Sequence, residues 1–414
     1  MINSIPGGIT AAKGFRAASC AAGIKYRDRT DMAMILSSVP CTAAGVFTTN
    51  RVKAAPVLWD REIIRSGSPV QAVVVNAGIA NAATGKAGLD LCRATAEAAG
   101  EKLGIPSSSV CLGSTGVIGP NIPLEKITAG ISMMAGSLSD SKEAGTAASK
   151  AIMTTDTVHK EFAVSFGLPS GKGDETVTVH LGGMCKGSGM IHPNMSTMLA
   201  YLTTDCAISR VLLQKALSEV TQDTFNMITV DGDTSTNDTL LVLANGLSGN
   251  RIIDQEDESY SLFCDALFTV CRTLAVKMAG DGEGATHLIE MRILNADTKE
   301  NARTFARSVV GSSLVKAMVF GRDANCGRIL CALGYAGPEF NPDLIELYLH
   351  GKNDTVCFFK DGRVIDFDEA KAAAILSERE IRFSCDMKMG NEEATAWGCD
   401  LTYDYVKING DYRS

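Results

Sequence analysis

Apolar residues along this chain recur in two kinds of run. Short continuous runs such as QAVVVNAG (71–78) and TLLVLANG (239–246) end in a glycine turn, which predicts buried strands. Longer alanine-rich runs such as DLCRATAEAAGEKLG (90–104) and YSLFCDALFTVCRTLAVKMAG (260–280) have the three- and four-residue spacing of helices. This alternation predicts an α/β or α+β fold rather than an all-β one.

Further segments repeat the pattern. SVCLGSTGVIGP (109–120) again predicts a strand followed by a glycine turn, and LEKITAGISMMAGSLSD (124–140) predicts a helix. Near the end, LTYDYVKI (401–408) alternates apolar and polar residues, which predicts a half-buried strand. No repeat, low-complexity tract or proline-rich linker divides the 414 residues, a length that allows two domains.

Composition and charge narrow the class of protein. A hydrophobic fraction of 45% with 21% charged residues is typical of a globular protein, and the net charge of −8 without a Lys/Arg run argues against a nucleic-acid partner. The thirteen cysteines stand singly, so we expect buried, reduced thiols. No stretch reaches about 18 apolar residues, and the start has no apolar signal region, so we expect a soluble, cytoplasmic protein with no membrane partner.

The segment KGSGMIHPNMSTMLAYLTTD (186–205) runs from a glycine loop directly into an apolar strand or buried helix. If the bond between Ser196 and Thr197 were cut, the new terminal threonine would carry a hydroxyl nucleophile and an α-amine of pKa about 8 that takes its proton. Gly187 and Gly189 would let the loop fold back for attack of the threonine hydroxyl on the preceding carbonyl. A helix cap or a strand start is the alternative interpretation.

Two more glycine-rich segments are candidate site loops. GSTGVIG (113–119) follows a predicted strand, and its amides could stabilise a tetrahedral intermediate by roughly 3 to 4 kcal/mol each; the alternative is a simple strand-to-helix turn. GDGEGATH (280–287) follows a helix and lacks the dinucleotide-binding spacing, so a C-capping loop is its alternative.

Two polar features also have two interpretations. IMTTDT (152–157) reads by itself as a helix end or N-cap cluster. Lys186 lies in a glycine-rich loop without the spacing of a phosphate-binding P-loop. It is either a partner for a substrate carboxylate or a solvated surface charge.

The segment KGSGMIHPNMSTML resembles the cleavage segment of the ornithine acetyltransferase family, the glutamate N-acetyltransferases of arginine biosynthesis. In that family the protein chain cleaves its own peptide bond before the threonine of an Ala-Thr-Met-Leu sequence. The resemblance implies a two-domain α/β fold with an N-terminal threonine nucleophile, cut into an α chain (1–196) and a β chain (197–414) that assemble as an α2β2 heterotetramer. Blocks similar to the family follow in the expected order over nearly the whole chain: GVFTTNRVKAAPV, VVNAGIANAATG, STGVIG, IMTTDT, GDGEGATH and YVKINGDYRS.

The resemblance also implies roles for single residues. Thr197 would take the acetyl group from N2-acetylornithine, release ornithine and pass the acetyl group to glutamate by a ping-pong route. The Thr115 hydroxyl and the Gly116 amide would form the oxyanion hole. The resemblance implies no metal or organic cofactor, and the sequence has no spacing typical of metal ligands. The implied substrate-binding residues are Thr154 (or Thr155), Lys186, Thr197, Glu283 for the ornithine ammonium, and Asn409 and Ser414 for the α-carboxylate end.

The chain departs from the family pattern at three positions. Ser196 stands where alanine is usual, and its small size should still allow cleavage. In FGRDANCGRIL (320–330), Ala324 and Cys326 replace a usual proline and tryptophan, which leaves the substrate range open.

Other functions also stay open. Acetyl-CoA as a further donor is undecided, since no motif specific for coenzyme A stands out. A related self-processed aminopeptidase or amide hydrolase, and a non-catalytic scaffold protein, are the alternatives to an acetyltransferase.

Overall fold

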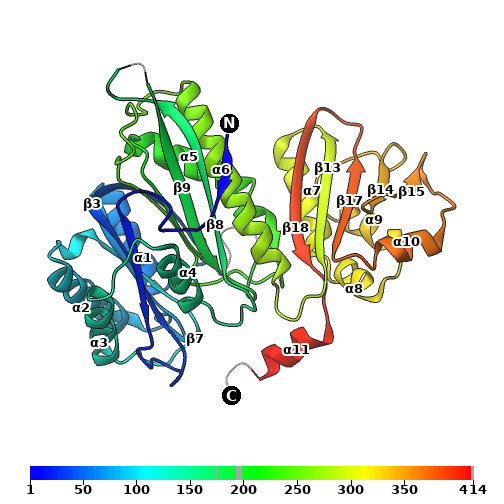
Figure 1. The fold of residues 1–414 in the computed structure, drawn as a ribbon. Helices are drawn as coiled ribbons and strands as arrows, with labels where there is room; N and C mark the ends of the chain where they lie inside the picture. The colour runs from blue at the N-terminus through cyan, green and yellow to red at the C-terminus, as the bar shows by residue number, and fades with distance from the viewer. Residues whose placement is uncertain (174, 193–197, 412–414) are drawn as a thin grey trace. The chain divides into compact units, whose positions relative to one another are not determined.

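The computed structural model describes residues 1–173, 175–192 and 198–411. The chain forms two compact units, each built from separate stretches of sequence (Figure 1). The mixture of strands and helices confirms the predicted α/β class. Unit 1 comprises Met1–Gly187, Asn194–Thr221 and Thr234–Leu274; unit 2 comprises Ser188–Pro193, Gln222–Asp233 and Ala275–Ser414.

A nine-stranded sheet forms the centre of unit 1. A separate pair of two-residue strands, β5 (Ile79–Ala80) and β7 (Val117–Ile118), lies outside it. In spatial order, the strands of the large sheet are β1 (Asn3–Ile5), β8 (Lys160–Pro169), β9 (Thr176–Lys186), β10 (Leu199–Thr204), β12 (Thr239–Ala244), β3 (Met32–Phe47), β4 (Val70–Asn76) and β6 (Val110–Ser114), with β2 (Phe15–Cys20) also paired to β3.

Strand β4 shows why the predicted strands read as continuous apolar runs. Val73 and Val75 belong to one hydrophobic cluster, while Ala72 and Val74 belong to another. Because successive side chains point to opposite faces of a strand, both faces of this sheet are covered. The strands predicted at 71–78, 109–120 and 239–246 are thus confirmed as β4, β6 and β12, and the apolar run that begins at Leu199 is strand β10.

The predicted helices of unit 1 are also confirmed. The second helix ends at Leu103, and Gly104 follows in the left-handed conformation with φ of +68°, as its C-terminal glycine indicates. The helix predicted over 124–140 ends earlier, at Ala135. The helices are α1 (Ala55–Ser66), α2 (Gly85–Leu103), α3 (Leu124–Ala135), α4 (Lys142–Ala151), α5 (Arg210–Gln222), the short η1 (Ser107–Ser109), and α6 (Glu258–Gly280), which continues into unit 2.

Unit 2 has a seven-stranded sheet whose core includes the buried side chains of Ile289, Met291 and Phe383. In spatial order, its strands are β11 (Ile228–Thr229), β18 (Glu392–Cys399), β13 (Leu288–Ala296), β17 (Glu380–Asp386), β14 (Glu346–His350), β15 (Thr355–Lys360) and β16 (Arg363–Val364). Its helices are η2 (Phe225–Met227), α7 (Lys299–Gly311), α8 (Ser313–Gly321), α9 (Cys326–Gly334), α10 (Glu369–Ile375) and α11 (Tyr403–Gly410).

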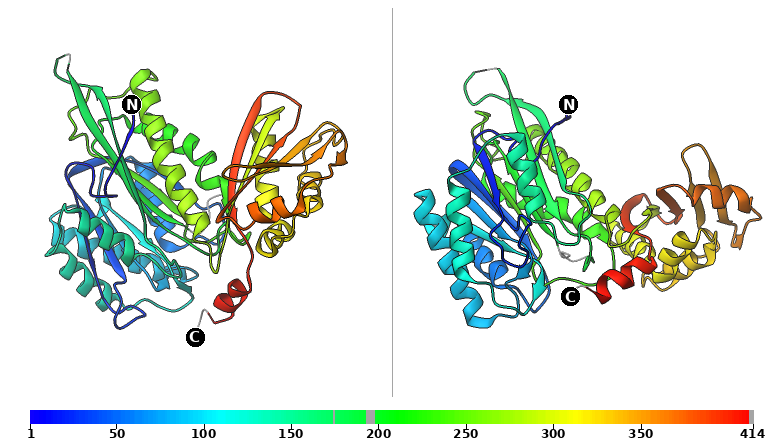
Figure 2. Two further views of the ribbon diagram at one scale, coloured as in Figure 1. Left: turned by 45° about the vertical axis from the view of Figure 1, so that its right-hand side comes forward. Right: turned by 60° about the horizontal axis from the view of Figure 1, so that its bottom comes forward.

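The strand predicted at 401–408 is wrong, because this segment contains helix α11, drawn in red in Figure 2. Within the helix the less exposed side chains are Tyr405 and Ile408, which lie three residues apart on one face, and the buried Thr402 directly precedes it. Tyr403 and Val406 are 85% and 69% exposed. In a segment of only eight residues, the same apolar positions fit both the two-residue period of a strand and the period of a helix. The alternation of apolar and polar residues therefore led to the wrong prediction.

All thirteen cysteines are free, and ten of them are buried, as predicted. Burial raises the pKa of the Cys41 and Cys92 thiols to about 12, so these thiols stay protonated. Cys326, one of the departures from the family pattern, begins α9 and is buried, so it is a packing position. Within the described part of the chain, no helix combines the length and the apolar character needed to cross a membrane.

Candidate active site

The candidate residues fall into two groups, one in each unit. Thr115, Gly116, Thr154 and Lys186 belong to unit 1, whereas Glu283 and Asn409 belong to unit 2. Three candidates, Ser196, Thr197 and Ser414, lie outside the described residues.

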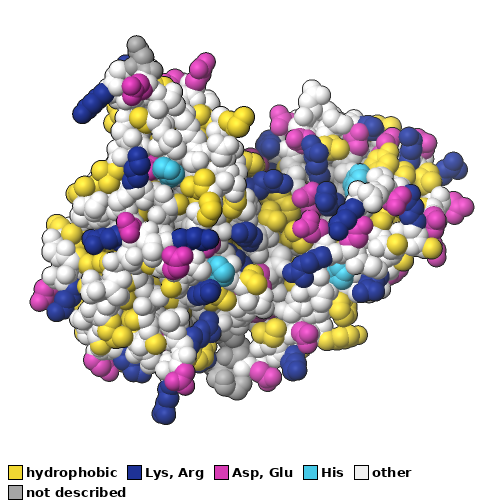
Figure 3. Space-filling view, viewed as in Figure 1, with side chains coloured by type: hydrophobic (Ala, Val, Ile, Leu, Met, Phe, Trp, Pro, Cys, Tyr) yellow, Lys and Arg dark blue, Asp and Glu magenta, His cyan; other side chains and the backbone are white. Residues whose placement is uncertain are grey.

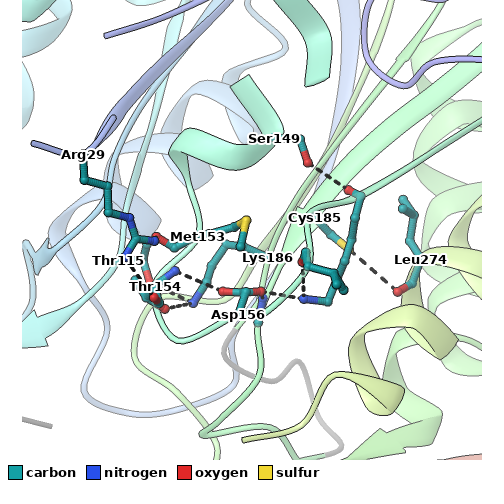
Figure 4. Close-up of polar contacts among 12 residues, drawn as sticks. Arg29, Thr115, Ser149, Met153, Thr154, Asp156, Cys185, Lys186 and Leu274 are labelled. Atoms are coloured by element: carbon teal, nitrogen blue, oxygen red, sulfur yellow. Dashed lines mark hydrogen bonds and ion pairs between the residues drawn. The ribbon is translucent and has the colours of Figure 1, made fainter. Parts of the chain in front are cut away.

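Lys186 joins two candidate threonines that are distant in sequence (Figure 4). It is the last residue of β9 and is only 3% exposed, so it is not a solvated surface charge. Its ammonium Nζ donates hydrogen bonds to the Thr154 Oγ1 at 2.9 Å and the Thr115 Oγ1 at 3.3 Å. The structure therefore brings together three of the predicted site residues.

The direction of these hydrogen bonds determines what the hydroxyls can do. An ammonium group has donors and no acceptor, so both threonine oxygens must accept from Lys186. Each hydroxyl then keeps its own hydrogen for another partner. A cation on the oxygen also polarises the O–H bond, which strengthens it as a donor. Thr115 and Thr154 are thus suited to stabilise an oxygen that becomes negatively charged.

Gly116 occupies a turn that no other residue fits. Its φ is +126°, and a Cβ there would overlap the carbonyl of Gly78. The turn is held on both sides, since the Thr115 N–H donates to the Asn76 carbonyl at 3.0 Å and the Val117 N–H donates to the Gly78 carbonyl at 3.1 Å. Within the described residues the Gly116 N–H has no acceptor, so it remains available to an incoming oxygen.

Asp156, which the sequence analysis did not single out, is hydrogen-bonded to residues on both sides of Lys186 in the fold, Thr154 and Gly187. Its Oδ1 accepts from the Lys160 Nζ and from the Gly187 N–H, both at 2.7 Å, and its Oδ2 accepts from the Thr154 N–H at 3.0 Å. Burial alone would raise the pKa of Asp156, but the charges of Lys186 and Lys160 lower it to about 2. A signal was present in the sequence, since Lys160 follows Asp156 at i+4, just after the IMTTDT segment.

Replacing this carboxylate should cost much stability. In Asp156→Asn, Lys160 and Lys186 lose the buried carboxylate that they share, which should lower the free energy of unfolding at pH 7 by about 3–5 kcal/mol. The folded-state pKa of about 2 lies below the ordinary 3.8, so the difference from the unchanged protein should be full at neutral pH and shrink as pH falls toward 2. Urea unfolding at pH 7 and pH 3 measures it. Asp90→Asn, which breaks an exposed pair with Arg93, is the control and should change stability by less than about 1 kcal/mol. Equal stability of the two variants at pH 7 would contradict this role.

Two aspartates anchor the chain on either side of residues 193–197. In unit 2, the Asp231 carboxylate accepts from the N–H groups of Met190 at 2.6 Å and Ile191 at 2.8 Å. In unit 1, the Asp238 Oδ1 accepts from the Met198 N–H at 3.0 Å, and burial raises the pKa of Asp238 well above its ordinary value. Sequence reasoning missed both, although the run DGDTSTNDT (231–239) places three aspartates among small polar residues.

Glu283 and Asn409 lie together in unit 2 although 126 residues separate them. Glu283 is 6% exposed, and its Oε2 accepts from the Asn409 Nδ2 at 2.6 Å. Its backbone N–H donates to the Ser188 carbonyl at 2.8 Å, and a Cβ at Gly189 would overlap its carboxylate. Among the residues that the structure describes, no Lys, Arg or His forms an ion pair with Glu283. This buried carboxylate is therefore suited to an ammonium group.

No group of His, Cys, Asp and Glu side chains within the described ranges is arranged to hold a metal ion. What the two groups offer is a pair of polarised hydroxyls and a free amide in unit 1, and a carboxylate in unit 2. Hydroxyl and amide donors suit a reaction in which negative charge develops on a carbonyl oxygen, as in acyl transfer.

Comparison with known proteins gives a consistent set of matches. The model of the ArgJ family matches residues 16–414. The arginine biosynthesis bifunctional protein ArgJ of Symbiobacterium thermophilum is 51% identical over 412 residues, and that of Caldanaerobacter subterraneus is 48% identical over 410 residues; each alignment covers 99% of both chains. A crystal structure of the ArgJ protein from Bacillus halodurans has 44% sequence identity and a TM-score of 0.49, covering 51% of this chain and 97% of that one.

Proposed function

Because this chain belongs to the ArgJ family of arginine-biosynthesis acyltransferases, we propose that it is a glutamate N-acetyltransferase that cuts itself between Ser196 and Thr197. Thr197 is the proposed nucleophile of both the cleavage and the transfer. The contact of Lys186 with Thr115 and Thr154 carries this proposal most directly, because it gathers candidate groups from three separate segments.

Cleavage begins with attack of the Thr197 hydroxyl on the Ser196 carbonyl carbon. The C–N bond breaks, the α-amine of Thr197 takes a proton, and the resulting ester is hydrolysed by water. The Thr115 hydroxyl and the Gly116 N–H stabilise the oxyanion of each tetrahedral intermediate. Asp231 and Asp238 support this step because they restrain Ile191 and Met198 on the two sides of the segment.

Transfer then uses the same hydroxyl twice. Thr197 takes the acetyl group from N2-acetylornithine, and its α-amine passes the hydroxyl proton to the departing amine of ornithine. Glutamate attacks the acetyl-threonine ester in the second half-reaction and leaves as N-acetylglutamate. Glu283 pairs with the side-chain ammonium of ornithine, while Asn409, Ser414 and Lys186 serve the carboxylate end of the substrate. Acetyl-CoA is a further proposed donor.

The sheet of unit 1 supports lasting association of the two products, the α chain 1–196 and the β chain 197–414. Strands β10 and β12 follow the cut in sequence, yet they lie between β9 and β3, which precede it. Each of the two flanking strand pairs has six residue pairs in register. Separation would break both ladders and expose strands that are buried along their whole length. The cut chains therefore stay as one folded protein, and we extend the proposal to an α2β2 heterotetramer in the cytoplasm.

A steady-state assay tests the reaction. Purified protein is given N2-acetylornithine with and without glutamate, and ornithine and N-acetylglutamate are both measured. Ornithine release that depends on glutamate and matches N-acetylglutamate formation supports transfer. Release that does not need glutamate would instead identify an aminopeptidase or amide hydrolase, and no release a non-catalytic protein. Replacing acetylornithine with acetyl-CoA tests the second donor.

A further inference from the structure

Unit 1 contains a groove of about 680 Å³ that none of the candidate site residues lines. Helices α1 and α5 and the end of strand β3 form its walls. Its volume lies within the roughly 300–1,000 Å³ of sites for small ligands. Four lining residues are cationic, Lys53, Arg61, Arg65 and Arg210, and none of the described lining residues is Asp or Glu.

The positive charges of this groove are not neutralised within the described chain. None of its four cations forms an ion pair with a described carboxylate, although the chain carries a net charge of −8. Arg61 and Arg65 are four residues apart on α1, where like charges repel and destabilise a helix. The surface that Figure 3 shows carries both Lys/Arg and Asp/Glu side chains. The groove is therefore a cationic site whose four charges have no carboxylate partner among the described residues, although Arg210 and Lys53 donate to backbone carbonyls.

The groove walls are held by hydrogen bonds that do not depend on a ligand. The Arg210 Nη2 donates to the carbonyls of Ile64 at 3.0 Å and Arg65 at 3.2 Å, which ties α5 to the end of α1. The side-chain amide of Gln214 exchanges two hydrogen bonds with the backbone of Gly45, at 3.1 and 3.2 Å. Binding would thus require little ordering of the walls, which favours affinity.

We propose that this groove binds a small molecule carrying two or more phosphate groups. Arginine guanidinium groups match phosphate oxygens with paired N–H donors, and several cations in one groove favour a multiply charged ligand. The wall is also connected to the strand that follows Thr197. Thr48 lines the groove, and its N–H donates to the Asp238 carbonyl at 3.0 Å, while the Asp238 carboxylate accepts from the Met198 N–H at 3.0 Å.

Two sources could supply such a ligand, a phosphorylated acyl carrier or a nucleotide acting as an effector. Titration calorimetry with coenzyme A, ADP and inorganic pyrophosphate distinguishes them. Stronger binding of coenzyme A than of ADP indicates the acyl carrier, and equal binding of both indicates the nucleotide portion. Either result supports the site if binding also depends on the groove arginines.

The test of that dependence is the double variant Arg61→Ala/Arg65→Ala, with Arg61→Gln/Arg65→Gln as a second version that keeps more of the side-chain length. Loss of two charge-assisted donors should weaken binding by about tenfold or more. Arg363→Ala, at an exposed position of β16 in unit 2, is the matched control and should bind as before. Transfer from acetylornithine to glutamate should be unchanged in all variants, and thermal unfolding verifies their fold. Because binding is measured directly, the result does not depend on the proposed transfer activity. No binding of any probe, or equal binding by the double variants and the unchanged protein, would overturn the proposal.

Discussion

Thr197→Ala is expected to leave the chain uncut and to abolish acetyl transfer, which should fall by a factor on the order of 10⁶, as for loss of a covalent nucleophile. Alanine has no hydroxyl to attack the Ser196 carbonyl, so the α-amine of residue 197 stays in a peptide bond. It also has no oxygen that could carry the acetyl group. A denaturing gel reports the first effect, and the glutamate-dependent assay reports the second.

Thr197→Ser is the matched control because it keeps the hydroxyl and removes only a methyl group. It should cut itself and transfer acetyl, both more slowly than the unchanged protein. Folding of the alanine variant is checked by its thermal unfolding. If that variant is folded and still cuts itself or still transfers acetyl, the nucleophile is another residue.

Thr115→Ala is expected to lower kcat by about 10²–10³-fold while KM changes little. The Thr115 hydroxyl accepts from Lys186 and points its own hydrogen elsewhere, so we assign it to charge that develops only in the transition state. Self-cleavage passes through a similar oxyanion and should slow as well. Steady-state kinetics with acetylornithine and glutamate gives both constants.

Thr115→Ser serves as the comparison for this variant, because it retains a hydroxyl for Lys186 and for the oxyanion, and its kcat should fall far less. The alanine variant should remain folded, since it removes one hydroxyl and leaves the Lys186 contact with Thr154. An unchanged kcat with a raised KM would show that Thr115 contributes to ground-state binding instead.

Local patterns in the sequence were enough for most of the fold. The strand at 71–78 was predictable from its short continuous apolar run, and the helix at 90–104 from its helical spacing, and each ends near a glycine. The segment 401–408 was not, because eight residues fit a strand period and a helix period about equally well. Asn409 belongs to helix α11, and its side chain contacts Glu283, which lies 126 positions earlier in the sequence.

The candidate site was predictable to a similar extent. The loops carrying Thr115, Thr154 and Lys186 could each be singled out, but each also read as an ordinary turn or surface charge. Only the fold shows that Lys186 is buried and donates to both threonines. Asp156 was missed because its importance comes from two lysines, one of them 30 residues later in the chain. Partnerships of this kind are set by strand pairing and leave no local periodicity.

The most direct test of self-cleavage at Thr197 is mass spectrometry of the purified, denatured protein combined with N-terminal sequencing. Scaled by residue count from 43.7 kDa, cleavage before Thr197 predicts two pieces of about 21 and 23 kDa. The larger piece should begin Thr-Met-Leu-Ala-Tyr, and the two should elute together before denaturation because their strands interleave in one sheet. A single 43.7-kDa chain, or a second piece that begins at another residue, would contradict the account.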